Sequence, residues 1–167
     1  ENIASPVQGF SIVPIAERPI LSTRYYSSYS VNDPFICRYA ELQRIAETEH
    51  VATSSTLFLV FHDHYKKQFL KDDGVQGDLE LFSNITGSAH HTEHCRMFGG
   101  FLAACATHIG HYRYTQPLYD ELMAWAASIG YSVSGISLQE LIIGRTMTSH
   151  EENFVTKINL PLNVSAI

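Results

Sequence analysis

The sequence predicts an α+β fold built from two copies of a β-α-β-β unit. The order strand, helix, strand, strand occurs once before a polar stretch in the middle of the chain and once after it. A short motif also repeats, since YAEL at residues 39–42 returns as YDEL at residues 119–122, 80 positions later. Agreement between element order and motif spacing indicates an internal duplication. We therefore expect one domain, residues 1–167, with pseudo-repeats over residues 8–86 and 99–162 and a linker at residues 87–98.

The first unit is predicted from one capped helix and the strands around it. Asp33 suits a helix cap and Pro34 suits the first helical position, so the helix should begin there and end near His50. Apolar residues recur along it at helical spacing, at Phe35, Tyr39, Leu42 and Ala46. The expected strands are rich in β-branched and aromatic residues or alternate in polarity, and they are residues 10–15, 18–30, 57–63 and 78–86.

The second unit follows the histidine-rich linker. Thr115, Gln116 and Pro117 open its helix, and Gly130 is well placed to end it. One face of this helix carries Leu118, Leu122, Trp125 and Ile129. The expected strands are residues 101–109, 137–144 and 154–161. In the first of them, small side chains leave room on one face, at Ala103, Cys105 and Thr107.

The bulk composition restricts the class of protein. The chain has 167 residues, of which 45% are hydrophobic and 17% are charged, and this suits one well-packed domain. Its formal charge of −6, without a cluster of Lys or Arg, argues against direct binding to nucleic acid. No apolar run approaches the roughly 20 residues of a membrane span, and three irregularly spaced cysteines favour a reducing compartment. We expect a cytoplasmic protein with no membrane partner and, because the sequence begins at Glu1, a fragment of a longer chain.

Glu140 is the most unusual residue of the predicted strands. Alternation places it on the same face as Leu138 and Ile142. An ionised carboxylate on an apolar face needs a cation, several hydrogen bonds or a proton. Val60 occupies the same position in the first unit, so the acid is an addition to an apolar scaffold. A binding site is one interpretation, and the alternative is a structural ion pair with an arginine such as Arg24 or Arg145.

The second half carries a block of residues in the order of a known family. They are Gly99-Gly100-Phe101, Gly110-His111-Tyr112, Leu118-Tyr119-Asp120-Glu121-Leu122, Trp125-Ala126, Gly130 and Glu140-Leu141-Ile142. In this block and in its element order the chain resembles the GyrI-like (gyrase-inhibitor-like) effector-binding domains. Those domains occur at the C-terminus of MerR-type and AraC-type bacterial transcription regulators, and also alone. The resemblance implies an SH2-like pair of β-α-β-β units whose curved antiparallel sheet surrounds a central ligand pocket, with Glu140 at its base.

The resemblance to multidrug-sensing members also implies a ligand class, a lipophilic aromatic molecule that is often cationic. Aromatic faces attract a cation, and a carboxylate neutralises it in a low-dielectric cavity. Glu140 would be the charge partner. The candidate ligand-binding residues are Glu140, Trp125, Tyr29, Tyr112, Phe61, Tyr25 and Ile142. For each aromatic the alternative role is plain core packing.

These observations predict the small-molecule effector-binding domain of a bacterial transcription regulator, of MerR type. We expect no cofactor and no metal. Contact with DNA would come only through an N-terminal domain that this sequence does not contain, and the full-length protein should be a homodimer.

Two other functions stay open on sequence grounds. Some relatives of the fold are hydrolases of small electrophiles, and a buried Glu140 with a tyrosine could form an acid–base pair. The chain nevertheless lacks the usual nucleophile and phosphate-loop motifs. A metal sensor would use the histidine-rich stretch, where His90 and His94 lie four residues apart, as do His91 and Cys95, with His62-Asp63-His64 as further candidates.

Overall fold

The computed structural model describes residues 9–28, 33–70, 75–88 and 92–163. Its strands are β1 (Ser11–Ile15), β2 (Arg18–Ser28), β3 (Leu57–Phe61), β4 (Gln76–Asn84), β5 (Cys95–Phe98), β6 (Phe101–Ile109), β7 (Ser132–Val133), β8 (Ser137–Ile143) and β9 (Val155–Asn163). Its helices are α1 (Asp33–Thr48) and α2 (Gln116–Ser128), with short 3-10 helices η1 (Tyr65–Phe69), η2 (Tyr112–Tyr114) and η3 (Glu151–Asn153).

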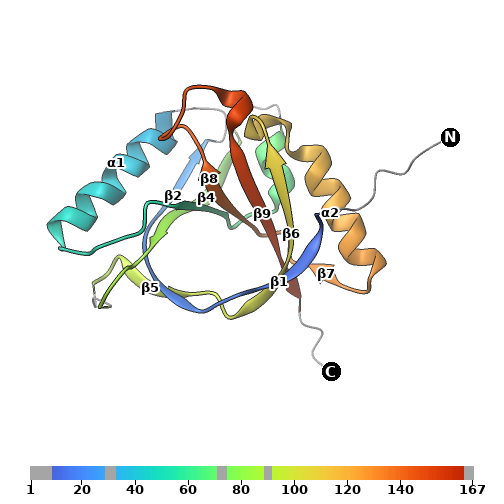
Figure 1. The fold of residues 1–167 in the computed structure, drawn as a ribbon, viewed down its shortest axis with the longest axis horizontal. Helices are drawn as coiled ribbons and strands as arrows, with labels where there is room; N and C mark the ends of the chain where they lie inside the picture. Colours follow the sequence, from blue (N-terminus) through green and yellow to red (C-terminus); the bar gives the residue numbers. More distant parts are fainter. Residues whose placement is uncertain (1–8, 29–32, 71–74, 89–91, 164–167) are drawn as a thin grey trace.

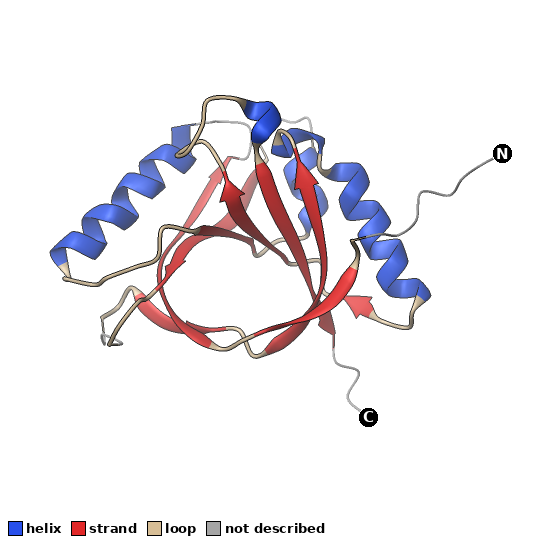
Figure 2. Ribbon diagram, in the orientation of Figure 1, coloured by secondary structure: helices blue, strands red, loops and turns tan. Residues whose placement is uncertain are grey.

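The strands form one antiparallel sheet in the order β1-β6-β9-β8-β3-β4-β2-β5, with β7 added beside β9. Figure 1 shows this sheet curling on itself, with α1 and α2 on its outer side. The β3–β8 pair lies at the centre, with β4 and β2 of the first half on one side and β9 and β6 of the second half on the other. The two outermost strands are exchanged, because β1 pairs with β6 and β5 pairs with β2. This arrangement confirms the predicted α+β fold with a curved antiparallel sheet, and Figure 2 shows the separation of helices from strands.

The structure differs from the sequence prediction within the stretch 87–98. Residues Cys95–Phe98 form β5, an edge strand that pairs with β2. Its side chains are divided between the two sides of the sheet, because Cys95 packs against the α1 core and Phe98 against the opposite core. A four-residue edge strand depends on backbone pairing with its neighbour, and its own polar sequence gives little signal for it.

The outer face of the sheet carries two cores, one beneath each helix. Leu42 and Ile45 of α1 pack on Leu21 and Leu81. Beneath α2, the helix packs on small and branched residues of β6 and β9. The buried members of this core are Tyr65, Ala104, Ala106, Tyr119, Leu122, Ala126, Ile158, Leu160 and Leu162. Each fully buried Leu or Ile side chain contributes about 1.5–3 kcal/mol to folding. The two helices are therefore fixed separately, each to its own half of the sheet.

The inner face of the curl has a third core and a buried carboxylate. Ile20, Phe58, Phe82 and Leu138 pack together there, and the Phe58 and Phe82 rings are stacked with centroids 4.8 Å apart. Glu80 points to the same side and is only 1% exposed.

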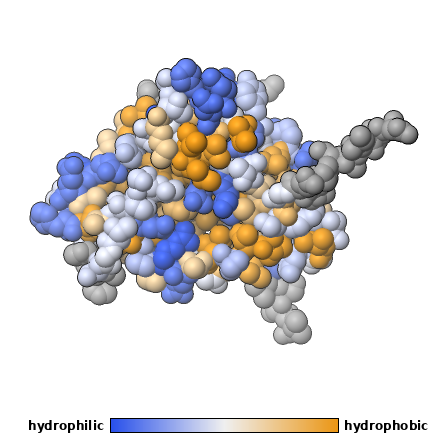
Figure 3. All heavy atoms as spheres, in the orientation of Figure 1, coloured by the Kyte–Doolittle hydropathy of each residue, from blue (hydrophilic) through white to orange (hydrophobic). Residues whose placement is uncertain are grey.

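The surface of the domain mixes polar and apolar side chains. On the face drawn in Figure 3, hydrophilic atoms cover the segment around η3 and apolar atoms gather just below it. Among the described residues, neither helix is long and apolar enough to cross a membrane.

Candidate functional site

A cavity of about 580 Å³ lies on the outer face of the sheet, over the central strands β3 and β8. Its floor is formed by Leu59 and Phe61 of β3 and by Gln139 and Leu141 of β8. These side chains share one face because Leu59 pairs with Gln139 and side chains alternate along each strand. The cavity therefore occupies the junction of the two halves of the domain.

The walls of the cavity come from both halves. Tyr25 of β2 and Phe35 of α1 line it on the side of the first half, and His111 and Tyr112 line it on the side of the second. Aromatic and aliphatic walls with a few polar groups are typical of small-molecule sites.

Hydrogen bonds hold the polar part of the floor in place. Gln139 is 2% exposed, and its Nε2 donates to the hydroxyl of Tyr119 over 2.7 Å. That hydroxyl lies 2.6 Å from the hydroxyl of Ser137. Complete burial raises the pKa of Tyr119, so its hydroxyl stays protonated. The network fixes the Gln139 amide at the bottom of the cavity.

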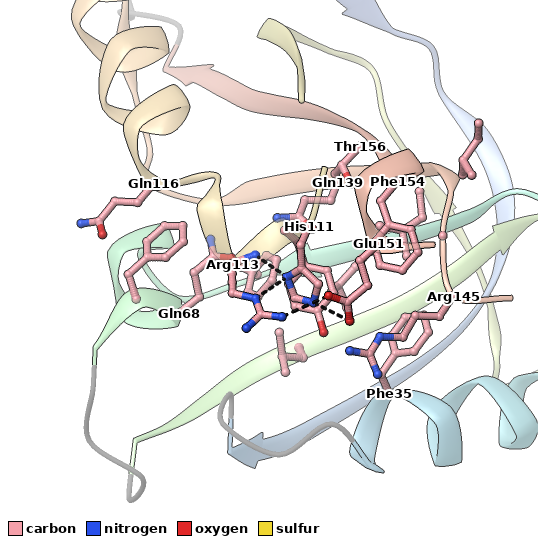
Figure 4. A pocket seen from close by; sticks show the side chains of 18 of the residues that line it. Phe35, Gln68, His111, Arg113, Gln116, Gln139, Arg145, Glu151, Phe154 and Thr156 are labelled. Carbon is pink, nitrogen blue, oxygen red and sulfur yellow. Dashed lines mark hydrogen bonds and ion pairs between the residues drawn. The ribbon is translucent and has the colours of Figure 1, made fainter. Parts of the chain in front are cut away.

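One side of the cavity carries a charged cluster of Arg113, His111 and Glu151, shown in Figure 4. The backbone N–H and the Nε of Arg113 both donate to Nδ1 of His111, over 3.0 and 3.2 Å. Nη2 of Arg113 donates to Oε2 of Glu151 over 3.1 Å. Burial and the nearby charge of Arg113 lower the pKa of His111. The imidazole is therefore neutral, with its proton on Nε2, which lies 3.6 Å from Oε1 of Glu151.

Arg145 adds a second guanidinium to the lining. Its guanidinium carbon lies 5.7 Å from the centre of the Tyr112 ring, within the range of a cation–π contact. Among the lining residues that the structure describes, two guanidinium groups thus stand against one carboxylate.

Three of the sequence-predicted site residues, Tyr25, Phe61 and Tyr112, line this cavity together. Burial raises the pKa of Tyr25 to about 12, so its phenol is neutral. The ring of Tyr25 is also covered by Arg38 of α1, whose guanidinium carbon lies 4.7 Å from the ring centre. The structure brings these three aromatics to one place from β2, β3 and η2.

Glu140 and Ile142 do not line the cavity. Glu140 pairs in register with Phe58 of β3 and Lys157 of β9, and it points to the inner side of the curled sheet. Gln139, its neighbour, takes the cavity-facing position. The expectation that Glu140 lies at the base of the pocket therefore needs correction for this cavity, because strand alternation turns its side chain to the other side.

Two cations lie near Glu140 on the inner side, Lys157 opposite it on β9 and Arg18 of β2. The guanidinium carbon of Arg18 lies over the rings of Phe58 and Phe98, 5.2 and 5.4 Å from their centres. Burial lowers the pKa of Arg18, and the negative charge of Glu140 opposes that shift. The alternative partner Arg24 instead binds Asp78, with Nη2 and Oδ2 2.6 Å apart.

The remaining sequence-predicted residues lie elsewhere. Trp125 packs edge-on against Phe10 in the α2 core, with ring centres 5.8 Å apart, and it does not line the cavity. Tyr29 lies outside the described residues.

The histidine-rich stretch is only partly described. His90 and His91 lie outside the described residues, and Nδ1 of His94 is 2.7 Å from Oε1 of Glu49. Within the described part of the chain, no group of three or more His, Cys, Asp or Glu side chains could hold a metal ion.

A second cavity of about 450 Å³ opens on the inner side, where Val60, Phe98 and Leu138 line it together with His62 and Arg96. These two polar residues are bound to the buried Glu80. Burial alone would raise the pKa of Glu80, but hydrogen bonds from His62 and Arg96 outweigh it and lower that pKa to about 2. The charges at this cavity are thus already neutralised by the protein itself.

Sequence reasoning missed Gln139, His111, Arg113, Arg145 and Glu151 as residues of the outer cavity. His111 could have been found, since it lies between Gly110 and the start of α2, in a block that marks the family resemblance. Arg113 and Glu151 are 38 residues apart and meet only through the fold.

Comparison with solved structures shows the same fold in proteins of low sequence identity. The C-terminal domain of EcmrR is 16% identical, with a TM-score of 0.76 and coverage of 93% of this chain and 98% of that one. EcmrR in a complex with DNA is 15% identical, with a TM-score of 0.74 and coverage of 93% and 57%. A hydrolase encoded by lin2189 of Listeria innocua is 10% identical, with a TM-score of 0.66 and coverage of 96% and 94%.

A search of curated protein sequences finds no match to this chain. A family model does match, and it is described as the GyrI-like small molecule binding domain. The match runs over residues 9–163, which is nearly the whole chain and includes every element of the fold described above. The chain therefore belongs to the GyrI-like family of small molecule binding domains.

Proposed function

We propose that this domain binds a small lipophilic aromatic molecule in the outer cavity and serves as the effector-binding part of a bacterial transcription regulator of MerR type. The observation that carries the proposal is the cavity at the junction of the two halves, with aromatic walls from both. Its volume of about 580 Å³ suits an aromatic molecule of two or three rings.

The location of the cavity gives a route from binding to regulation. A ligand there contacts β2 and α1 of one half and η2 of the other. It therefore favours whichever relative placement of the halves gives it the better contacts, and shifts the population toward that state. Likeness to the C-terminal domain of EcmrR supports a role of this kind. DNA would be bound by another segment of a longer, dimeric protein, since this chain carries a formal charge of −6.

The alternative of a hydrolase needs a carboxylate that can act on a bound substrate. Glu151 is the carboxylate among the described lining residues, and its oxygens already face Arg113 and His111. Glu140 lies on the other side of the sheet from the cavity tyrosines. We therefore propose binding without turnover.

A neutral fluorescent dye tests the binding proposal. N-phenyl-1-naphthylamine becomes fluorescent in apolar cavities, and we expect it to bind this domain saturably with one site per chain. Leu141→Trp places a large side chain on the cavity floor and should weaken dye binding by about tenfold or more. Leu102→Trp is the matched control, because Leu102 is exposed on β6 and does not line the cavity. Absence of saturable binding, or equal affinity in both variants, would overturn the proposal.

A further inference from the structure

We propose that the outer cavity selects aromatic molecules that carry an anionic group, which replaces the carboxylate of Glu151 beside Arg113 and His111. The inference rests on the proposed function, since it specifies the ligand class for the same cavity. It concerns the charge of the ligand, which an apolar cavity alone would leave open.

The first support is the charge of the lining. Arg113 and Arg145 outnumber Glu151 among the described lining residues, and His111 is neutral. Two guanidinium groups thus gather at one cavity of a chain whose overall formal charge is −6. Charges interact more strongly beside an apolar cavity than in bulk water. The guanidinium groups attract an anionic group on an aromatic ligand and repel a cationic one.

The second support is the geometry around Glu151. Its Oε2 lies 3.1 Å from Nη2 of Arg113, and its Oε1 lies 3.6 Å from Nε2 of His111. Figure 4 shows both side chains pointing toward the same carboxylate. Both nitrogens carry protons, since Nδ1 of His111 accepts from Arg113 and leaves the imidazole proton on Nε2. Two hydrogen bonds from Arg113 to Nδ1 fix the orientation of the imidazole. The protein thus holds a pair of donors suited to one carboxylate or sulfonate.

The third support is that Glu151 can leave at low cost. Its side chain is 44% exposed, and it lies on η3 in the connection between β8 and β9. Ion pairs of such exposure contribute little to the stability of a protein, because water screens both charges. Glu80 is the contrasting case, because its side chain is 2% exposed and would lose its partners without gaining water. Glu151 is therefore a tethered carboxylate that a ligand anion can replace.

The apolar walls lie within reach of the same position. Tyr112 is adjacent to His111, and their ring centres are 4.0 Å apart. Phe154 is also close to the imidazole, with ring centres 5.9 Å apart. An aromatic ring joined directly to an acidic group can thus contact these rings while its anion meets Arg113.

The experiment compares two dyes that differ in charge. 1-Anilinonaphthalene-8-sulfonate carries the ring system of N-phenyl-1-naphthylamine plus one sulfonate, so the pair isolates the contribution of the anion. We expect the sulfonate dye to bind the wild-type domain at least as tightly as the neutral dye. Rhodamine 6G serves as the cationic comparison and should bind more weakly than either.

Three variants locate the effect at the proposed position. Glu151→Gln should tighten binding of the sulfonate dye by about fivefold, because its competitor is removed. Glu152→Gln is the matched control, since Glu152 is exposed, faces His150 and does not line the cavity. Arg113→Gln should weaken the sulfonate dye by about tenfold. The neutral dye should change less in affinity than the sulfonate dye in Glu151→Gln and Arg113→Gln, and it should keep its affinity in Glu152→Gln, whose residue does not line the cavity.

The outcomes separate this inference from the proposed function. If neither dye binds, the cavity is not a binding site, and both the proposed function and the selection for anions are refuted. If the neutral dye binds but the sulfonate dye responds equally to Glu151→Gln and Glu152→Gln, or not at all to Arg113→Gln, the cavity is confirmed and selection for anions is refuted. Tighter binding of rhodamine 6G than of the sulfonate dye also refutes it.

Discussion

Gln139 and Glu140 are neighbours on β8, yet their side chains lie on opposite sides of the curled sheet. Gln139 forms part of the floor of the outer cavity and binds the hydroxyl of Tyr119. Glu140 faces the inner side, where Arg18 is stacked on aromatic rings. The polar group that the cavity offers a ligand from β8 is therefore an amide, and the carboxylate serves the protein interior.

Replacing Glu140 should leave ligand binding unchanged and reduce stability slightly. Glu140→Gln keeps the shape of the side chain and removes the charge that faces Arg18. We expect the free energy of unfolding to fall by about 1 kcal/mol or less, since Glu140 is only partly buried. The affinity for N-phenyl-1-naphthylamine should stay within about twofold of wild type. Urea denaturation measures the stability and dye titration of the same sample measures the affinity. A large loss of dye binding would show that Glu140 takes part in the binding site.

Removing the buried hydroxyl of Tyr119 should lower the free energy of unfolding more than removing the hydroxyl of an exposed tyrosine. Tyr119→Phe leaves Gln139 and Ser137 without their shared partner in a fully buried position. A buried polar group that loses its hydrogen bond costs about 1–3 kcal/mol. Tyr131→Phe is the control, because Tyr131 is 39% exposed. Urea midpoints should show a clear decrease for the first variant and almost none for the second, with similar m-values.

Acid should destabilise the domain through Glu80. The pKa of this carboxyl is about 2 in the folded state, below its usual value of 4.5. A lowered acid pKa means that the unfolded chain binds the proton more tightly, so the stabilisation is complete above pH 4.5 and is lost as the pH falls toward 2. The stabilisation at neutral pH is about 3 kcal/mol. Glu80→Gln should remove it.

Unfolding measured at pH 7 and at pH 3 tests the assignment to Glu80. The difference in unfolding free energy between these two values should shrink in Glu80→Gln and persist in Glu152→Gln, whose carboxylate is exposed. Equal pH dependence in the two variants would contradict it.

Gly99 should not tolerate a side chain. Its φ of +107° lies in a region that L-residues rarely adopt, and a Cβ built there would lie 2.2 Å from the carbonyl oxygen of Ala16. Gly99→Ala must therefore displace the turn between β5 and β6 from the β1–β2 connection. We expect a loss of about 2 kcal/mol or more in unfolding free energy. Gly130→Ala is a useful comparison, because Gly130 also has a positive φ but an added methyl group there would meet open space. It therefore measures the cost of the backbone conformation without a steric clash.

Much of the fold could be predicted from the sequence because its local signals agree with its global arrangement. The helix starts expected at Asp33 and at Gln116-Pro117 agree with where α1 and α2 begin, and the apolar stripes of both helices face their sheets. The edge strand β5 could not be predicted, because its short polar sequence carries no strand pattern and it is held by backbone pairing with β2.

The site was harder to predict because β8 is buried on both faces. Leu138 and Gln139 are 1% and 2% exposed, so alternation shows which residues share a face but not which face meets the cavity. Tyr25 and Phe61 were candidates as aromatics of β2 and β3, and in the structure both line the cavity. Trp125 lies at helical spacing with core residues, and core packing is the role it takes in the structure.

The most direct test of the account is a crystal structure of the domain with N-phenyl-1-naphthylamine bound. We predict that the naphthyl ring lies on the outer face of the sheet, in contact with Phe61 and Tyr112 and above Gln139. Density for the dye on the inner face instead, beside Glu140 and the rings of Phe58 and Phe98, would contradict the assignment of the binding site.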